Sequence, residues 1–204
     1  MSLKFYITDF VNFFSKKGVA TFVAANFSLS NLAFFNMLFS HFELLRFPNS
    51  ALGTMMYPTL SKEKYEQKQR AYISRNIWFN LFIYSPILLA AYFLYPKLVL
   101  LFYGPEYEII TQYFPYILLA GAPYLIAYPI GHYFSSNGAP QYEGLIVFFS
   151  LSIQLVSVIL FNYYDNFTLF NAVVSQAIGF IGFTLALFVM YSLKQLAPIQ
   201  FEEA

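Results

Sequence analysis

The chain of 204 residues contains no cysteine, only two histidines and few charged residues. Without cysteine it cannot form a disulfide, a thiolate zinc site or a thiol nucleophile. Charged residues make up 10% of the sequence and the net charge is +1, so a basic surface that could neutralise nucleic-acid phosphates is missing. Hydrophobic residues make up 59%, and this excess over charge excludes an ordinary soluble domain.

Several long stretches lack Asp, Glu, Lys and Arg altogether, among them residues 76–96, 144–164 and 166–193. Each reaches the about 20 apolar residues that a helix needs to cross the hydrocarbon core of a bilayer. In lipid the backbone must satisfy its own hydrogen bonds, which a helix does. These stretches therefore predict an all-α integral membrane protein, a bundle of five or six transmembrane helices.

Five spans are expected within a bundle that covers residues 31–196. The first is too long for one straight crossing, and we expect Pro48 to kink it. Turn residues separate the later spans at Gly104-Pro105, at 137–140 and at Asp165-Asn166. The expected spans are 31–60, 76–100, 112–134, 144–162 and 169–194.

Residues 1–30 form an N-terminal apolar segment of a different kind. Its apolar run, 7–27, is interrupted by Asp9, Lys16 and Lys17. It is either a sixth, compromised span or an amphipathic helix that lies on the membrane surface. Ser28, Ser30 and Asn31 are expected to supply a turn and a helix cap before the first firm span.

The basic residues predict an orientation. Five of the eleven Lys and Arg residues lie between the first two firm spans, at positions 62, 64, 68, 70 and 75. The positive-inside rule places this loop in the cytoplasm, and alternation then places the tail, 197–204, on the same side. A multi-pass protein of the inner (plasma) membrane is expected.

The first span carries one polar stripe. At 100° per residue one side of a helix holds Asn36, Glu43, Arg46, Ser50 and Gly53, and His41 points to the other. Glu43 and Arg46 form either a self-contained ion pair or part of a water-filled cavity in which Arg46 receives an anionic substrate. Snorkelling of Arg46 toward an interface is a third interpretation.

The third span, 112–134, combines several prolines with a histidine. Pro115, Pro123 and Pro129 can bend or break the helix, and discontinuous helices build midplane sites in many transporters. His132 near its inner end is a hydrogen-bonding residue of the membrane interface or a proton relay.

Catalysis is poorly provided for. Metal-ligand spacing, a phosphate-cradling glycine loop and a nucleophile elbow are all missing from the sequence, so we expect no cofactor and no enzyme activity. Transport or a structural role is favoured instead.

Residues 31–196 resemble the C-terminal half of polysaccharide and lipid-linked oligosaccharide flippases, in the superfamily that also holds the multidrug and toxin extrusion antiporters. The stretch FNMLFSHFELLRFPNSALGTMMYPTLSKEK resembles the eighth helix of that family and the basic loop that follows it. FYGPEYEIITQYFPYILLAG resembles a turn that leads into an apolar helix, and SSNGAP a short inner turn. The stretch YYDNFTLFNAVVSQ replaces the glycine- and alanine-rich turn that is common before the last helix.

The resemblance implies one six-helix lobe of a twelve-helix transporter that flips polyprenyl-diphosphate-linked glycans for cell-surface polysaccharide synthesis. It implies a cavity that holds Arg46, with Lys16 or Lys17 close to it. It also implies a second lobe, supplied by a missing N-terminal half or by a partner chain, and contact with membrane lipid. The alternatives are a cation-coupled multidrug antiporter lobe and, from another class, an integral-membrane glycan polymerase or ligase or a non-catalytic assembly subunit.

Overall fold

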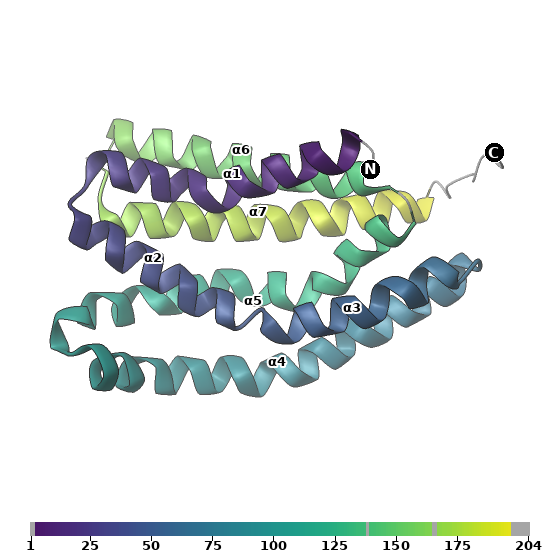
Figure 1. Cartoon of the computed structure of the whole chain (residues 1–204), viewed down its shortest axis with the longest axis horizontal. Helices are drawn as coiled ribbons and strands as arrows, with labels where there is room; N and C mark the ends of the chain where they lie inside the picture. The colour runs from purple at the N-terminus through teal and green to yellow at the C-terminus, as the bar shows by residue number, and fades with distance from the viewer. Residues whose placement is uncertain (1–2, 138, 165–166, 197–204) are drawn as a thin grey trace.

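A computed structural model describes residues 3–137, 139–164 and 167–196. All regular structure in these ranges is helical, and its helices lie side by side along the longest dimension of the molecule (Figure 1). They are α1 (Leu3–Asn26), α2 (Leu29–Leu44), α3 (Phe47–Lys62), α4 (Glu66–Tyr103), the 3-10 turn η1 (Pro105–Tyr107), α5 (Glu108–Ser136), α6 (Pro140–Tyr164) and α7 (Leu169–Leu196).

Four stretches of helix are long and apolar enough to cross a membrane. They are Glu66–Tyr103, Pro105–Ser136, Gln141–Tyr164 and Leu169–Leu193. These ranges contain the apolar parts of four of the five expected spans, and they identify the chain as a membrane protein. The turn at Gly104 is also confirmed, with φ of 94°, a conformation that favours glycine. The expected turn at 165–166 and the tail 197–204 lie outside the described residues.

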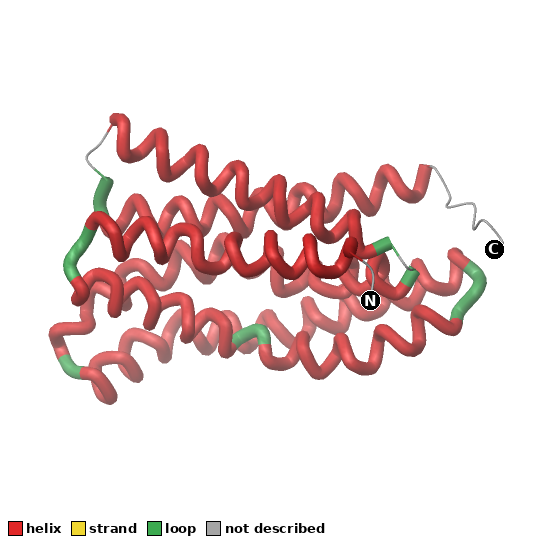
Figure 2. The backbone as a smooth tube through the Cα atoms, turned by 45° about the horizontal axis from the view of Figure 1, so that its top comes forward, coloured by secondary structure: helices red, strands yellow, loops and turns green. Residues whose placement is uncertain are grey.

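The expected span at 31–60 is not among the four candidates, and the kink expected at Pro48 is a complete break between two helices. α2 ends at Leu44 and α3 begins at Phe47, and each has 16 residues, fewer than a membrane crossing needs. Pro48 explains where α2 ends: it cannot donate a hydrogen bond to the carbonyl of Leu44, four residues earlier, and its ring clashes with that carbonyl. Figure 2 shows the resulting loop in the middle of the molecule, whereas the other loops lie at its ends.

The N-terminal segment is a helix, α1, but it is not among the four candidate spans. It lies along α6 (Figure 1) and buries Val19 and Val23 completely. Of the three residues expected to form a turn and a cap, Ser28 is the N-cap of α2: its hydroxyl accepts a hydrogen bond from the backbone N–H of Asn31 at 3.3 Å.

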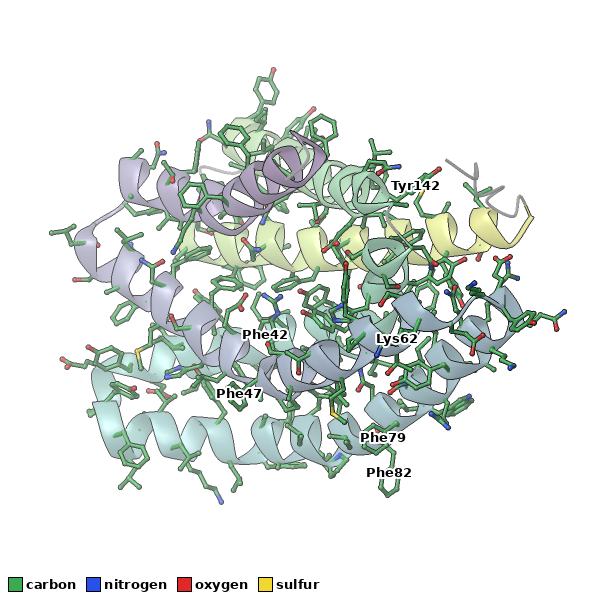
Figure 3. All side chains as sticks on the ribbon, turned by 45° about the vertical axis from the view of Figure 1, so that its right-hand side comes forward. Phe42, Phe47, Lys62, Phe79, Phe82 and Tyr142 are labelled. Atoms are coloured by element: carbon green, nitrogen blue, oxygen red, sulfur yellow. The ribbon has the colours of Figure 1, made fainter. Side chains whose placement is uncertain are left out.

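α5 is the central helix. It contacts α2, α3 and α4 on one side and α6 and α7 on the other, so it joins two groups of helices (Figure 1). The three prolines of α5 leave it helical throughout its length, although a break was one of the expected results. The outer surface is rich in large apolar side chains such as Phe79 and Phe82, which project away from the bundle (Figure 3). Such a surface suits contact with lipid tails.

Candidate functional site

A cavity of about 640 Å³ lies among α1, α2, α5, α6 and α7. Its lining combines charged and amide side chains with aromatic rings. The polar lining residues that matter for its chemistry are Lys17, Asn36, Glu43, Arg46, Gln154 and Gln176.

Arg46 is held at this cavity by two contacts. One terminal nitrogen, Nη1, donates to both carboxylate oxygens of Glu43 at 2.7 Å, and the guanidinium carbon lies 5.2 Å from the ring centroid of Tyr124. The Arg46 side chain is 18% exposed and that of Glu43 46%. Nε of Arg46 is buried and has no hydrogen-bond partner among the described residues. The sequence allowed two interpretations of Glu43 and Arg46, an ion pair or part of a cavity, and in the structure the ion pair lines the cavity.

The loop between α2 and α3 places Arg46 at mid-length of the bundle, and buried hydrogen bonds hold that loop. The Tyr84 hydroxyl donates to the carbonyl of Leu45 at 2.9 Å. The Asn49 amide donates to the carbonyl of Leu125 at 2.9 Å, and the Asn80 amide donates to Asn49 Oδ1 at 2.9 Å. The Leu125 carbonyl is free for this contact because its helical partner four residues later is Pro129, which has no N–H. Pro129 thus leaves free the acceptor that fixes α3 and α4 to α5.

A second polar group joins α6 to α7 at the cavity wall. Gln154 Nε2 donates to Gln176 Oε1 at 2.6 Å, and the Ser150 hydroxyl donates to the Gly179 carbonyl at 2.7 Å. Gln154 is 1% exposed, and its Oε1 has no partner among the described residues. Sequence reasoning missed these amides. The sequence offers one signal for this group: Ser150 and Gln154 are four residues apart in a stretch without charge, so they share one face of a helix.

Aromatic rings form the rest of the wall. Tyr124 stacks with Phe180 at a centroid distance of 5.6 Å and meets Phe183 edge-on at 5.1 Å. Tyr128 packs edge-on against His132 at 5.0 Å. The sequence did not single out these rings, because tyrosine and phenylalanine are abundant along the whole chain.

The residues predicted for the site fall into two groups. Asn36, Glu43, Arg46, Lys17 and His132 line the cavity together. Ser50 does not line it, because the loop at 45–46 interrupts the helical phase that placed Ser50 on the stripe.

Lys16 and His41 are the other two residues singled out from the sequence. The side chain of Lys16 lies outside the described residues. His41 faces away from the cavity, as expected, with Nδ1 3.0 Å from the Tyr95 hydroxyl.

His132 contacts α3 as well as the cavity. A Cβ atom at Gly53 would lie too close to its imidazole, so glycine is needed there. The ring nitrogen Nε2 is buried without a hydrogen-bond partner among the described residues.

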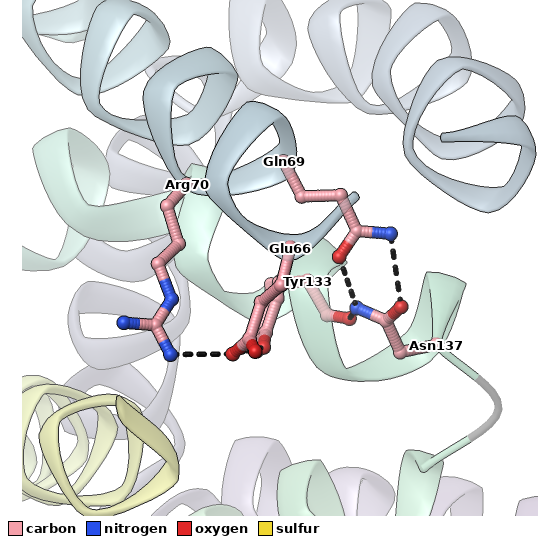
Figure 4. Close-up of polar contacts among 5 residues, drawn as sticks. All are labelled: Glu66, Gln69, Arg70, Tyr133 and Asn137. Atoms are coloured by element: carbon pink, nitrogen blue, oxygen red, sulfur yellow. Dashed lines mark hydrogen bonds and ion pairs between the residues drawn. The ribbon is translucent and has the colours of Figure 1, made fainter. Parts of the chain in front are cut away.

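A separate polar cluster ties α4 to the end of α5 (Figure 4). Glu66 pairs with Arg70 and accepts a hydrogen bond from the Tyr133 hydroxyl at 3.1 Å. Gln69 and Asn137 exchange amide hydrogen bonds of 3.1 and 3.2 Å. Arg70, expected as a loop cation, therefore points into the bundle.

Comparison with models of known protein families, with curated proteins and with solved structures finds no match for this chain. In the ranges that the structure describes, no group of three His, Cys, Asp or Glu side chains could hold a metal ion.

Proposed function

We propose that the chain is one lobe of a membrane transporter that flips polyprenyl-diphosphate-linked oligosaccharides by alternating access. One observation carries the proposal: Arg46 faces a polar cavity of about 640 Å³ from a helix break at mid-length of an otherwise apolar bundle. Charged groups within a bilayer are expensive and mark substrate pathways. Irregular backbone at that depth is tolerated where it lines a cavity.

The chemistry of the cavity suits an anion attached to a polar, hydroxyl-rich group. A guanidinium binds phosphate oxygens through several N–H donors, and Lys17 adds a second cation to the lining. Glu43 already accepts from Nη1 of Arg46, so a diphosphate competes with an internal carboxylate and can be released again. The Gln154–Gln176 amides at the cavity wall offer hydrogen-bonding groups for a sugar.

The alternative of a cation-coupled drug antiporter requires a carboxylate that is free to bind a cation. Both oxygens of Glu43 accept hydrogen bonds from Arg46 at 2.7 Å. The Glu143 carboxylate accepts from the Ser135 hydroxyl at 2.6 Å. Engagement of both acids favours an anionic substrate over a cationic one.

Binding of a fluorescent polyprenyl-diphosphate sugar to the full chain in nanodiscs tests the proposal. We expect Arg46→Gln to weaken binding about tenfold or more, the value of one charge-assisted hydrogen bond. Lys97→Gln is the matched control, since Lys97 is exposed near the C-terminal end of α4 and does not line the cavity. Equal affinity of Arg46→Gln and wild type would remove Arg46 from substrate binding.

A further inference from the structure

The outward face at the start of α4 changes from basic to apolar along the helix. Positions separated by three and four residues share this face, within roughly 100° of the circumference. From the loop into the membrane they are Tyr65, Lys68, Tyr72, Arg75, Phe79 and Phe82. Figure 3 shows Phe79 and Phe82 projecting outward, and Lys68 and Arg75 are exposed two to four turns before Phe82. The cations thus stand where the apolar surface of the helix begins.

We define the basic face as the exposed side chains of Lys62, Lys64, Lys68 and Arg75. Within the described ranges none of the four forms an ion pair. The neighbouring acids are engaged elsewhere. Glu63 accepts from the backbone N–H of Tyr65 at 3.1 Å, and Glu66 turns into the bundle toward Arg70 and Tyr133 (Figure 4). The loop therefore presents its positive charge outward and keeps one acid inside.

Two tyrosines hold the cations of the helix at this face. The ammonium nitrogen of Lys68 lies 5.0 Å from the ring centroid of Tyr65, and the guanidinium carbon of Arg75 lies 5.1 Å from that of Tyr72. Cation–π contacts of this kind keep the charge beside an amphipathic ring. Tyrosine rings sit at the headgroup level of a bilayer. Their position brings the cations to the depth of lipid phosphates.

We propose that the basic face binds the headgroups of anionic phospholipids in the leaflet that surrounds the start of α4. Charge complementarity selects this partner, because clustered Lys and Arg next to a membrane span attract anionic lipid. The apolar continuation of the same face places the ligand in the membrane. The inference is independent of the transported substrate and of the cavity.

The only tryptophan of the chain, Trp78, reports on this face directly. It is 68% exposed and lies one helical turn after Arg75. The full chain is reconstituted in phosphatidylcholine vesicles with a minor fraction of phosphatidylglycerol, and bromine is placed on the acyl chains of one lipid or the other at equal mole fraction. We expect brominated phosphatidylglycerol to quench Trp78 about twofold more than brominated phosphatidylcholine. The excess should disappear near 1 M salt, where the Debye length is about 3 Å.

Charge removal provides the decisive comparison. The variant Lys62→Gln/Lys64→Gln/Lys68→Gln/Arg75→Gln should quench equally with both lipids, while Lys97→Gln should retain the excess. Unchanged quenching by brominated phosphatidylcholine shows that the variant is inserted normally. Equal quenching by the two lipids in wild type would overturn the proposal and make an acidic protein segment the partner of this face. Retained excess in the quadruple variant would overturn it as well.

Discussion

Gly121 of α5 packs against the ring of Phe42 from α2. A Cβ atom at this position would overlap that ring, which is completely buried in a close-packed interior. We expect Gly121→Ala to destabilise the protein by about 1–3 kcal/mol, the usual cost of overpacking. Thermal unfolding in detergent measures the change.

Gly131 supplies the matched control on the same helix. No atom lies within 4 Å of the position that its Cβ would occupy. Gly131→Ala should be neutral or should stabilise α5 by up to about 1 kcal/mol, because alanine favours the helix. Equal melting temperatures for the two variants would show that the close contact of Phe42 with Gly121 is not present.

The Glu43–Arg46 pair should show coupling between its two members. Arg46→Met alone leaves the Glu43 carboxylate without its partner, whereas Glu43→Gln/Arg46→Met leaves no charge. Since Glu43 is 46% exposed, we expect the single variant to be less stable than the double variant by only about 1 kcal/mol. Chemical denaturation in mixed micelles tests the order. A double variant less stable than the single one would contradict it.

Residue patterns predicted part of the site. The 100° rotation per residue placed Asn36, Glu43 and Arg46 on one side correctly, because all three lie within or directly after α2. It failed for Ser50, since periodicity cannot pass through a helix break. Gln154 and Gln176 escaped notice because an uncharged amide does not interrupt a hydrophobic stretch. Their mutual hydrogen bond depends on packing of α6 against α7.

At the scale of helices, hydropathy predicted the spans correctly wherever a single uninterrupted helix runs the length of the bundle. It identified α4, α5, α6 and α7, and turn residues located the ends at Gly104 and Asn137. It could not distinguish a kinked helix from two helices in the segment around Pro48. The loop there is held by Tyr84 and Asn80 of α4, and such tertiary contacts are invisible in a local pattern.

Topology can be tested because the chain has no cysteine of its own. Ser61 lies at the end of α3 and Glu106 in η1, two turns at opposite ends of the bundle in Figure 1. An impermeant thiol reagent added to intact cells should label Glu106→Cys and leave Ser61→Cys unlabelled, because the basic loop is expected inside. Labelling of Ser61→Cys from outside would reverse the orientation.

At the scale of the whole molecule, a chain that is a single lobe provides only one of the two units that enclose a transport pathway. Alternating access requires two units that rock around a site near the midplane. We therefore expect the purified chain in liposomes to bind a labelled polyprenyl-diphosphate sugar without flipping it. Protection of the label from a reagent outside the vesicles measures flipping. Flipping by this chain alone would contradict the expectation and make a homodimer the functional unit.

The loop between α2 and α3 also bears on how the protein enters the membrane during synthesis. A helix of 16 residues is about 24 Å long, short of the about 30 Å of hydrocarbon. Neither half offers the insertion machinery a complete signal, and Glu43 and Arg46 lie at the junction. The hydrogen-bond donors that hold the junction come partly from α4, which emerges from the ribosome later. We therefore expect residues 29–62 to reach their final position only after α4 is made, because Tyr84 and Asn80 supply these donors.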